Sequence, residues 1–281
     1  MKKLNKELFK NQRFLLVFDL DGTLLNNKET ISPLTKSLLF ELKGLGNIIT
    51  IASGRPERAI KPYFDELGLT GPFICCNGAL VVNPDEKGFR PLKKMIKNEF
   101  VHRFFGKFPE HLFSNFMIED EDTQYYLRYN EEYKFFFCPE GIKHAYGSVF
   151  ETIHNDVLSM VIELKDLNMS HQIQDWIESE YDGLSIRFWD DAPRFGEIFH
   201  YSVNKSTGID YISQQYHLDR QHVICFGDAM NDIEMIKRAG ISFAMKNGAY
   251  GIKEAASYVT PYTNDEEGIY YALLDLFGKE E

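Results

Sequence analysis

The sequence predicts an α/β protein whose parallel-sheet core is interrupted by an inserted α+β module. Three apolar runs of strand length, residues 14–18, 48–52 and 222–226, each lead into a small or acidic polar residue. Strands buried on both faces of a parallel sheet read as continuous apolar runs, so we expect these three to lie in one sheet. About 150 residues separate the end of the second run from residue 205, far more than a helix and its loops require.

The first run ends at two acidic residues. Asp19 and Asp21 follow it directly, with a Gly-Thr pair behind them. They fall at the carboxyl end of the strand, where open α/β sheets bind ligands. Two like charges in one place are costly unless a cation lies between them, so the pattern predicts a divalent metal, and oxygen ligands favour Mg²⁺. An acidic, solvated turn is the alternative interpretation.

The other two runs repeat this design. Residues 53–55 (Ser-Gly-Arg) follow the second run, and Asp228 follows the third, with Asp232 four residues later. If the strands are parallel neighbours, these residues meet Asp19 at one edge of the sheet. If a helix begins near residue 229, Asp228 and Asp232 face one ion together. Acidic groups at a helix start would explain Asp228 alone, but not its coincidence with Asp19.

A phosphoryl group needs hydrogen-bond donors, and three residues suit that role. Ser53 offers a hydroxyl, Gly54 an unobstructed amide, and Lys205 a compact positive charge. Lys205 precedes an amphipathic stretch, residues 209–216, and its place between the second and third runs is what distinguishes it from an ordinary surface lysine.

Three further side chains are expected near the substrate. Asn231 is expected to point towards phosphate or substrate. Arg55 and Asn77 either face the non-reacting part of the substrate or have structural roles, Arg55 at a strand end and Asn77 in an Asn-Gly turn.

Four ordered segments resemble the motifs of the haloacid dehalogenase superfamily. They are residues 19–23 (Asp-Leu-Asp-Gly-Thr), Ser53, Lys205 and residues 227–232 (Gly-Asp-Ala-Met-Asn-Asp). Residues 53–55, 77–79, 244–247 and 264–268 further resemble the Cof-type sugar-phosphatase subfamily, whose members carry a large α/β cap. The resemblance implies a Rossmann-like catalytic core formed by residues 1–83 and 200–281, and a cap, residues 84–199, that sets substrate specificity.

The resemblance also implies a reaction. The expected activity is Mg²⁺-dependent hydrolysis of small phosphorylated metabolites such as sugar phosphates, with Asp19 as the nucleophile that forms an aspartyl-phosphate. Asp21 is the implied general acid and base. The implied metal ligands are the carboxylates of Asp19 and Asp228 and the backbone carbonyl of Asp21, while Asp232 lies just beyond them or reaches the metal through water.

Two other functions share these residues. A phosphotransferase or phosphomutase of the same superfamily would pass the phosphoryl group from Asp19 to another hydroxyl, and a regulator would bind a phosphorylated metabolite without turnover. A dehalogenase is disfavoured because it needs neither Asp21 nor Mg²⁺.

Composition is consistent with a cytoplasmic enzyme that acts on a small phosphorylated metabolite. The 281 residues are 44% hydrophobic, and the net charge of −11 argues against binding to nucleic acid or an anionic membrane. The apolar run 14–18 is too short for a secretory signal, and no stretch approaches the length of a membrane helix. The four cysteines have no zinc or CxxC spacing, which favours free thiols in a reducing compartment. Nothing indicates a protein partner.

The insertion contains both helical and strand-like patterns. We expect it to leave the core near residues 83–88 and to return near 198–202. Amphipathic periodicity predicts helices at 99–108 and 169–181, and strands are expected at 113–118, 124–129, 157–164, 184–189 and 195–199. Such strands can form an antiparallel platform backed by helices.

Overall fold

The structure is a computed structural model that describes residues 3–10, 12–131, 142–181, 183–189 and 192–279. The chain divides into two compact units. The core unit comprises residues 1–92 and 204–281, and the inserted unit comprises residues 93–203. Both boundaries fall later in the chain than the 83/84 and 199/200 boundaries expected from sequence. In the described part of the chain, no helix has the length and apolar character needed to cross a membrane.

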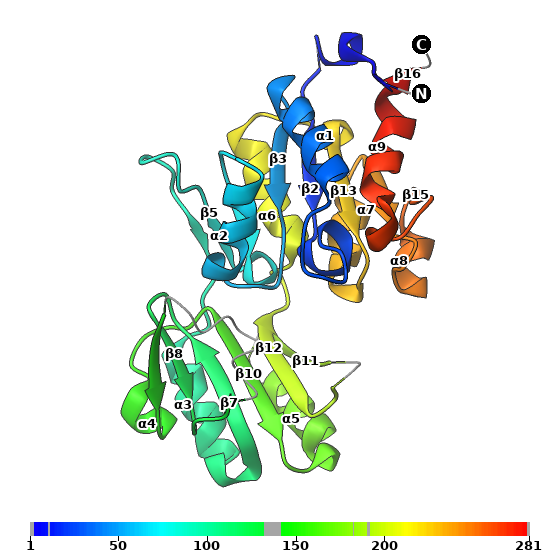
Figure 1. The fold of residues 1–281 in the computed structure, drawn as a ribbon. Helices are drawn as coiled ribbons and strands as arrows, with labels where there is room; N and C mark the ends of the chain where they lie inside the picture. The colour runs from blue at the N-terminus through cyan, green and yellow to red at the C-terminus, as the bar shows by residue number, and fades with distance from the viewer. Residues whose placement is uncertain (1–2, 11, 132–141, 182, 190–191, 280–281) are drawn as a thin grey trace. The chain divides into compact units, whose positions relative to one another are not determined.

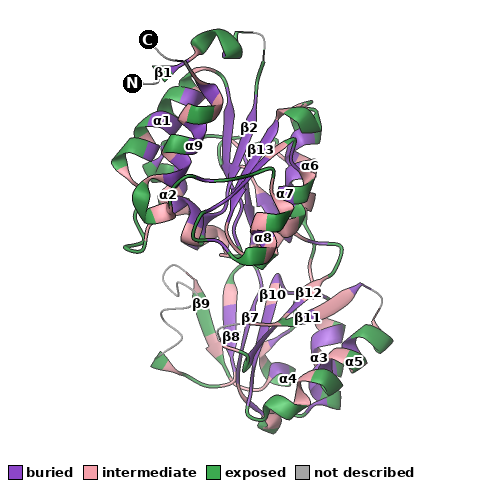
Figure 2. Cartoon of the chain, turned by 90° about the vertical axis from the view of Figure 1, so that its right-hand side faces the viewer, coloured by how far each residue is buried: buried purple, intermediate pink, exposed green. Residues whose placement is uncertain are grey.

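A parallel sheet forms the centre of the core unit (Figure 1). Its described strands, in spatial order, are β15 (Tyr258–Val259), β14 (Ile241–Ala244), β13 (Val223–Gly227), β2 (Leu15–Phe18) and β3 (Ile48–Ile51). The three apolar runs of the sequence are therefore the neighbouring parallel strands β13, β2 and β3, as predicted. Figure 2 shows β2 and β13 buried along their length.

Helices cover the sheet from both sides. In Figure 2 the sheet lies between α1 and α9 on one side and α6 and α7 on the other. The described helices of this unit are α1 (Pro33–Gly44), α2 (Glu57–Glu66), α6 (Lys205–Gln215), α7 (Ile233–Arg238), α8 (Tyr250–Ala255) and α9 (Gly268–Phe277). Apolar side chains of α6, α7 and α8 pack in one cluster with Leu15, Val17 and Cys225 of the sheet. Burial of this apolar surface is what holds the strands at fixed register.

A row of aromatic rings crosses the sheet one step before its carboxyl edge. Phe18 stacks on Phe226, Phe226 on Phe243, and Phe243 on Tyr258, with centroid distances of 5.1, 4.7 and 5.3 Å. These residues are register partners on four adjacent strands. Because Phe18 precedes Asp19 and Phe226 lies two residues before Asp228, the row fixes the platform from which both acids project.

Shorter strands add to the core unit, and one of them ends at Lys93, the first residue of the inserted unit. A three-stranded sheet has the order β4 (Phe73–Cys75), β5 (Leu80–Val82) and β6 (Leu92–Lys93). It joins the main sheet through a parallel bridge between Ala52 and Ile74. Near the chain ends, β1 (Lys3–Leu4) pairs antiparallel with β16 (Gly278–Lys279).

The inserted unit is a mixed sheet with helices. Its described strands have the order β11 (Leu184–Phe188), β12 (Phe195–His200), β10 (Ser159–Leu164), β7 (Phe113–Glu119), β8 (Thr123–Tyr126) and β9 (Lys143–Tyr146). Its described helices are α3 (Asn98–Lys107), α4 (Val149–Thr152) and α5 (Ser170–Glu180). All five predicted strands and both predicted helices are found, with shifts at their ends.

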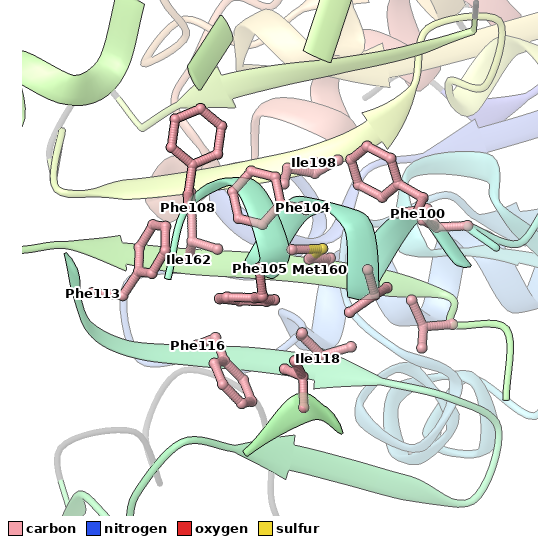
Figure 3. Close-up of a cluster of buried hydrophobic side chains, with 14 of the residues drawn as sticks. Phe100, Phe104, Phe105, Phe108, Phe113, Phe116, Ile118, Met160, Ile162 and Ile198 are labelled. Carbon is pink, nitrogen blue, oxygen red and sulfur yellow. The ribbon is translucent and has the colours of Figure 1, made fainter. Parts of the chain in front are cut away.

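One face of this sheet packs against an aromatic-rich helix. Phe100, Phe104 and Phe105 of α3 lie against sheet residues such as Phe116 and Ile162, all with at most 1% of their surface exposed (Figure 3). The spacing of these phenylalanines along α3 places them on one stripe of the helix. The inserted unit therefore has a hydrophobic core of its own.

Two expectations need correction. The sheet of the inserted unit is not wholly antiparallel, because β9 pairs parallel with β8. Residues 127–142 separate these strands, a connection long enough to return the chain in the same direction. Helix α6 begins at Lys205 rather than near residue 209, because Asn204 and Thr207 form a capping box that starts the helix there.

Candidate active site

The carboxyl edge of the core sheet gathers the predicted acidic residues. Asp19 follows β2 and is held in the sheet by its amide, which donates to the Phe226 carbonyl at 3.0 Å. The Asp19 side chain is 8% exposed. Ser53 follows β3 at the same edge, since the Ala52 amide donates to the Phe18 carbonyl at 2.9 Å. The strand order thus brings together the residues that follow the three apolar runs.

Lys205 is fully buried between two of these acids. Its Nζ donates 2.5 Å hydrogen bonds to Asp19 Oδ1 and to Asp232 Oδ1. The start of α6 is fixed beside this edge by Gly78, where a Cβ atom would lie 2.1 Å from the Asn204 carbonyl oxygen. Only glycine, here at φ 99°, permits this approach. A lysine that looks ordinary in sequence therefore becomes the buried counter-charge of the site.

The three carboxylates form one cluster. Asp19, Asp228 and Asp232 each offer an oxygen atom within 4.8 Å of the others. Asp232 Oδ2 accepts from the amides of Asp228 and Ala229 at 3.0 and 3.1 Å, so Asp232 also fixes the turn that carries Asp228. Both Asp232 oxygens are thus engaged by protein donors, whereas Lys205 contacts only one oxygen of Asp19.

The turn after Asp19 is shaped around Asp228. Thr23 Oγ1 donates to Asp228 Oδ1 at 2.8 Å. Gly22 has φ 73°, and a Cβ atom at this position would lie 2.4 Å from Asp228 Oδ2. Glycine is required here both by the left-handed backbone and by the nearness of the carboxylate.

Asp21 points to a different partner. Arg55 Nε donates to Asp21 Oδ2 at 2.9 Å and Arg55 Nη2 to Asp21 Oδ1 at 2.5 Å, a bidentate ion pair. The Asp21 side chain is 56% exposed, in contrast to buried Asp19. The Arg55 guanidinium also lies 5.7 Å from the ring centroid of Tyr63.

The remaining predicted residues are Ser53, Gly54, Asn77 and Asn231. Ser53 Oγ accepts from the Arg55 amide at 3.1 Å, which fixes the tripeptide 53–55 as a tight turn. Asn77, at φ 52°, accepts from Asn231 Nδ2 at 3.1 Å. A Cβ atom on Gly54 would lie 3.2 Å from the Asn77 side-chain amide. Asn77 and Asn231 are therefore partners of each other, next to Gly54.

Burial and charge shift the ionisation of the cluster. Burial, reinforced by the charge of Asp232, raises the pKa of Asp19 well above its ordinary value, against the opposing effect of Lys205. Burial and Asp232 also raise the pKa of Asp228 to about 6. Burial opposes the charged form of Lys205, but Asp19 and Asp232 outweigh it and raise the Lys205 pKa. Three carboxylates facing one ammonium leave an excess of negative charge.

This donor set fits a hard divalent cation. The cluster offers carboxylate oxygens from Asp19, Asp228 and Asp232 within reach of one ion, and such oxygens are the ligands that Mg²⁺ prefers. The charge of Asp232 contributes, after burial, to the raised pKa values of Asp19 and Asp228, and a further positive charge would offset that repulsion.

The sequence predicted no role for the side chains of Thr23 and Asn204. The available signals were the Thr of the sequence Asp-Leu-Asp-Gly-Thr and the Asn-x-x-Thr capping pattern of residues 204–207, which includes Lys205. Among the described residues, Cys75, Cys76 and Cys225 are free thiols, and Cys138 lies outside the described residues. None of the three is in the acidic cluster.

Comparison with known proteins covers nearly the whole chain. Over 265 residues, which are 94% of this chain and 97% of the relative, it is 29% identical to a 5-amino-6-(5-phospho-D-ribitylamino)uracil phosphatase of Bacillus subtilis. Among solved structures, a haloacid dehalogenase-like hydrolase from Bacteroides thetaiotaomicron is 26% identical, with a TM-score of 0.77 over 95% of this chain and 100% of the other. A subclass IIB sugar phosphatase of the same superfamily is 25% identical, with a TM-score of 0.74 over 94% and 98%.

The family model for haloacid dehalogenase-like hydrolases matches residues 16–273, which span both units. This match confirms the family predicted from the four ordered motifs. The chain belongs to the haloacid dehalogenase-like hydrolases.

Proposed function

We propose that this protein is a Mg²⁺-dependent phosphatase that hydrolyses a small phosphorylated metabolite through an aspartyl-phosphate on Asp19. The observation that carries the proposal is the position of Asp19, which is buried, paired with Lys205 and grouped with Asp228 and Asp232. A phosphate monoester is a dianion, and a carboxylate can attack it only where positive charge offsets the repulsion. Lys205 supplies part of that charge.

The proposed first step transfers the phosphoryl group to Asp19. The Asp19 carboxylate forms a bond to phosphorus while the bond to the leaving oxygen breaks, and Asp21 gives that oxygen a proton. In the second step Asp21 takes a proton from water, which attacks phosphorus and releases inorganic phosphate from Asp19. Because Arg55 holds both Asp21 oxygens, we propose that this ion pair opens or turns when Asp21 acts on the leaving group.

The other residues bind and orient. The Ser53 hydroxyl, the Gly54 amide and Lys205 are proposed phosphate donors, with Asn231 beside them and Asn77 and Arg55 facing the rest of the substrate. Asp19 and Asp228, with the Asp21 carbonyl, would hold Mg²⁺, and Asp232 would support them through its bonds to the Asp228 turn. Bound there, Mg²⁺ would neutralise negative charge between the nucleophile and the phosphate.

The substrate class rests on the relatives. Those named above are described as a phosphatase of a phosphorylated ribitylaminouracil and as a sugar phosphatase. We therefore propose a substrate with a phosphorylated sugar or sugar alcohol, and we propose that the inserted unit, predicted as residues 84–199, selects it.

Phosphate release tests this proposal. The substrate panel would contain an aryl phosphate, several sugar phosphates and 5-amino-6-(5-phospho-D-ribitylamino)uracil, each with Mg²⁺ or EDTA, for wild type and Asp19→Asn. Release that needs Mg²⁺ and is lost in Asp19→Asn supports the proposal. Transfer to an added alcohol rather than to water would indicate a phosphotransferase, and binding without release would indicate a regulator.

A further inference from the structure

Asn247 links the turn after Asp19 to a distant part of the core unit. Its Nδ2 donates to the Gly22 carbonyl at 2.7 Å, and its Oδ1 accepts from the Asn264 amide at 3.1 Å. Asn247 is exposed, in the segment between β14 and α8. Both polar ends of one side chain thus connect segments that lie 225 and 17 residues away in sequence.

The bonded carbonyl belongs to a peptide that affects the whole site. Because the peptide unit is planar, holding the Gly22 carbonyl towards Asn247 also fixes the direction of the Thr23 amide on the opposite side. Asp21 lies immediately before this glycine, and Thr23 immediately after it holds Asp228 Oδ1. A rotation of the Gly22–Thr23 peptide would therefore move the proposed acid and the support of a proposed metal ligand together.

The far side of this link is itself anchored. Asn264 Nδ2 donates to the Leu25 carbonyl at 2.9 Å, and the Asn27 amide donates to Asp265 Oδ1 at 2.8 Å. Glu267 accepts from Thr35 Oγ1 at 3.1 Å. Residues 264–267 are thus bound at several points to the segment that follows the catalytic turn, which gives Asn247 a fixed support.

Glycine makes such a support necessary. Glycine has more conformational freedom than any other residue type. Gly22 adopts a left-handed conformation here, with the Asp228 carboxylate close to it on one side. Thr23 holds the turn from the Asp228 side, and Asn247 holds it from the carbonyl side. These two hydrogen bonds hold the turn from opposite sides, in addition to the backbone hydrogen bonds from the Leu24 amide to the Asp19 carbonyl at 3.2 Å and from the Leu25 amide to the Leu20 carbonyl at 2.9 Å.

We propose that Asn247 is a positioning residue for the catalytic turn, an inference that rests on the proposed phosphatase function. It contacts no reacting atom, and acts by fixing the Gly22–Thr23 peptide. Its loss therefore lowers kcat while leaving substrate binding nearly unchanged, because misorientation of catalytic groups affects the transition state more than the bound substrate.

Three variants test the role. Asn247→Ala removes both hydrogen bonds, whereas Asn247→Asp keeps an acceptor for the Asn264 amide but cannot donate to Gly22. Asn26→Ala is the matched control, since Asn26 accepts from Lys28 and Thr30 in a neighbouring exposed loop and makes no bond to residues 19–23. Each variant is measured for kcat, KM and Tm, and for hydrogen exchange of peptides covering residues 15–25.

The expected result is a loss of about tenfold in kcat for both Asn247 variants, with KM within about twofold of wild type and a Tm no lower than that of Asn26→Ala. Exchange in residues 20–24 should be faster in the Asn247 variants alone. Wild-type kcat in Asn247→Ala, or a loss that only follows its folded fraction, would overturn the inference.

A failure of the proposed function would give a different result from a failure of the present inference. If the wild type hydrolyses no phosphate ester, that function is wrong and the exchange data decide the present inference. Faster exchange in residues 20–24 of Asn247→Ala than of Asn26→Ala then supports a positioning role for Asn247, and equal exchange contradicts it.

Discussion

Lys205 donates a 2.5 Å hydrogen bond to Asp19 from a side chain with no exposed surface. The same Nζ contacts Asp232 at 2.5 Å, so one ammonium serves two buried carboxylates. Removal of one member of a buried charge group leaves the others uncompensated, which is more costly than the loss of the bond itself. The lysine is therefore both a proposed phosphate ligand and a structural requirement of the metal-free protein.

Lys205→Met should lower the stability of the core unit by about 3–5 kcal/mol in EDTA, because Asp19 and Asp232 then repel each other without a buried cation. Added Mg²⁺ should raise the Tm of this variant by more than it raises that of wild type. Thermal unfolding with and without Mg²⁺ measures both effects. Lys107→Met, at an exposed position, is the control and should unfold like wild type.

The raised pKa of Asp228, about 6, gives the metal-free protein a pH-dependent stability. A carboxyl whose pKa is higher in the folded state stabilises the fold when protonated, and this contribution is lost as pH rises through about 4 to 6. The shift from 3.8 corresponds to about 3 kcal/mol.

Asp228→Asn keeps an acceptor for Thr23 but has no charge. In EDTA its stability relative to wild type should therefore increase between pH 4 and pH 7, whereas saturating Mg²⁺ should favour wild type. Denaturant unfolding at several pH values measures this difference. Asp175→Asn, at an exposed position on α5, should show no such trend, and a flat profile for Asp228→Asn would contradict the assignment.

Gly22→Ala should damage the site more than the fold. The new Cβ would lie 2.4 Å from Asp228 Oδ2 in a left-handed backbone, so either the turn or the carboxylate must move. We expect a stability loss of about 1–2 kcal/mol and a weaker apparent affinity for Mg²⁺, measured by titration calorimetry. Gly44→Ala, at a helical glycine with nothing within 4 Å, is the control and should be neutral or stabilising. Unchanged Mg²⁺ affinity in Gly22→Ala would argue against Asp228 as a ligand.

The sequence was sufficient to predict which residues lie at the carboxyl edge of the sheet, because the patterns that predict them are local. Apolar or mostly apolar runs identified β2, β3 and β13, and the first polar side chain after each run was expected at the carboxyl edge. That reasoning brought together Asp19 and Asp228 without any knowledge of side-chain positions.

The sequence alone did not predict which side chains contact each other. The Arg55–Asp21 ion pair and the Asn247–Gly22 bond join residues far apart in sequence, and either depends on loop conformations that no local pattern specifies. The same holds for the parallel pairing of β9 with β8, where strand patterns are compatible with either direction. The start of α6 was predicted too late, near residue 209, although Asn204 and Thr207 are a local capping signal for a start at Lys205.

The most direct test of the central claim is to identify the phosphorylated residue. Asp21→Asn should slow breakdown of the intermediate, because it removes the proposed base for the second step. We would mix this variant with Mg²⁺ and an aryl phosphate, quench it in acid, and locate the phosphoryl group by mass spectrometry, with Asp19→Asn as the control. A phosphoryl group on Asp19 that is absent from the control is the predicted result. Turnover with no phosphoryl group on Asp19, or with one on another residue, would contradict the aspartyl-phosphate mechanism.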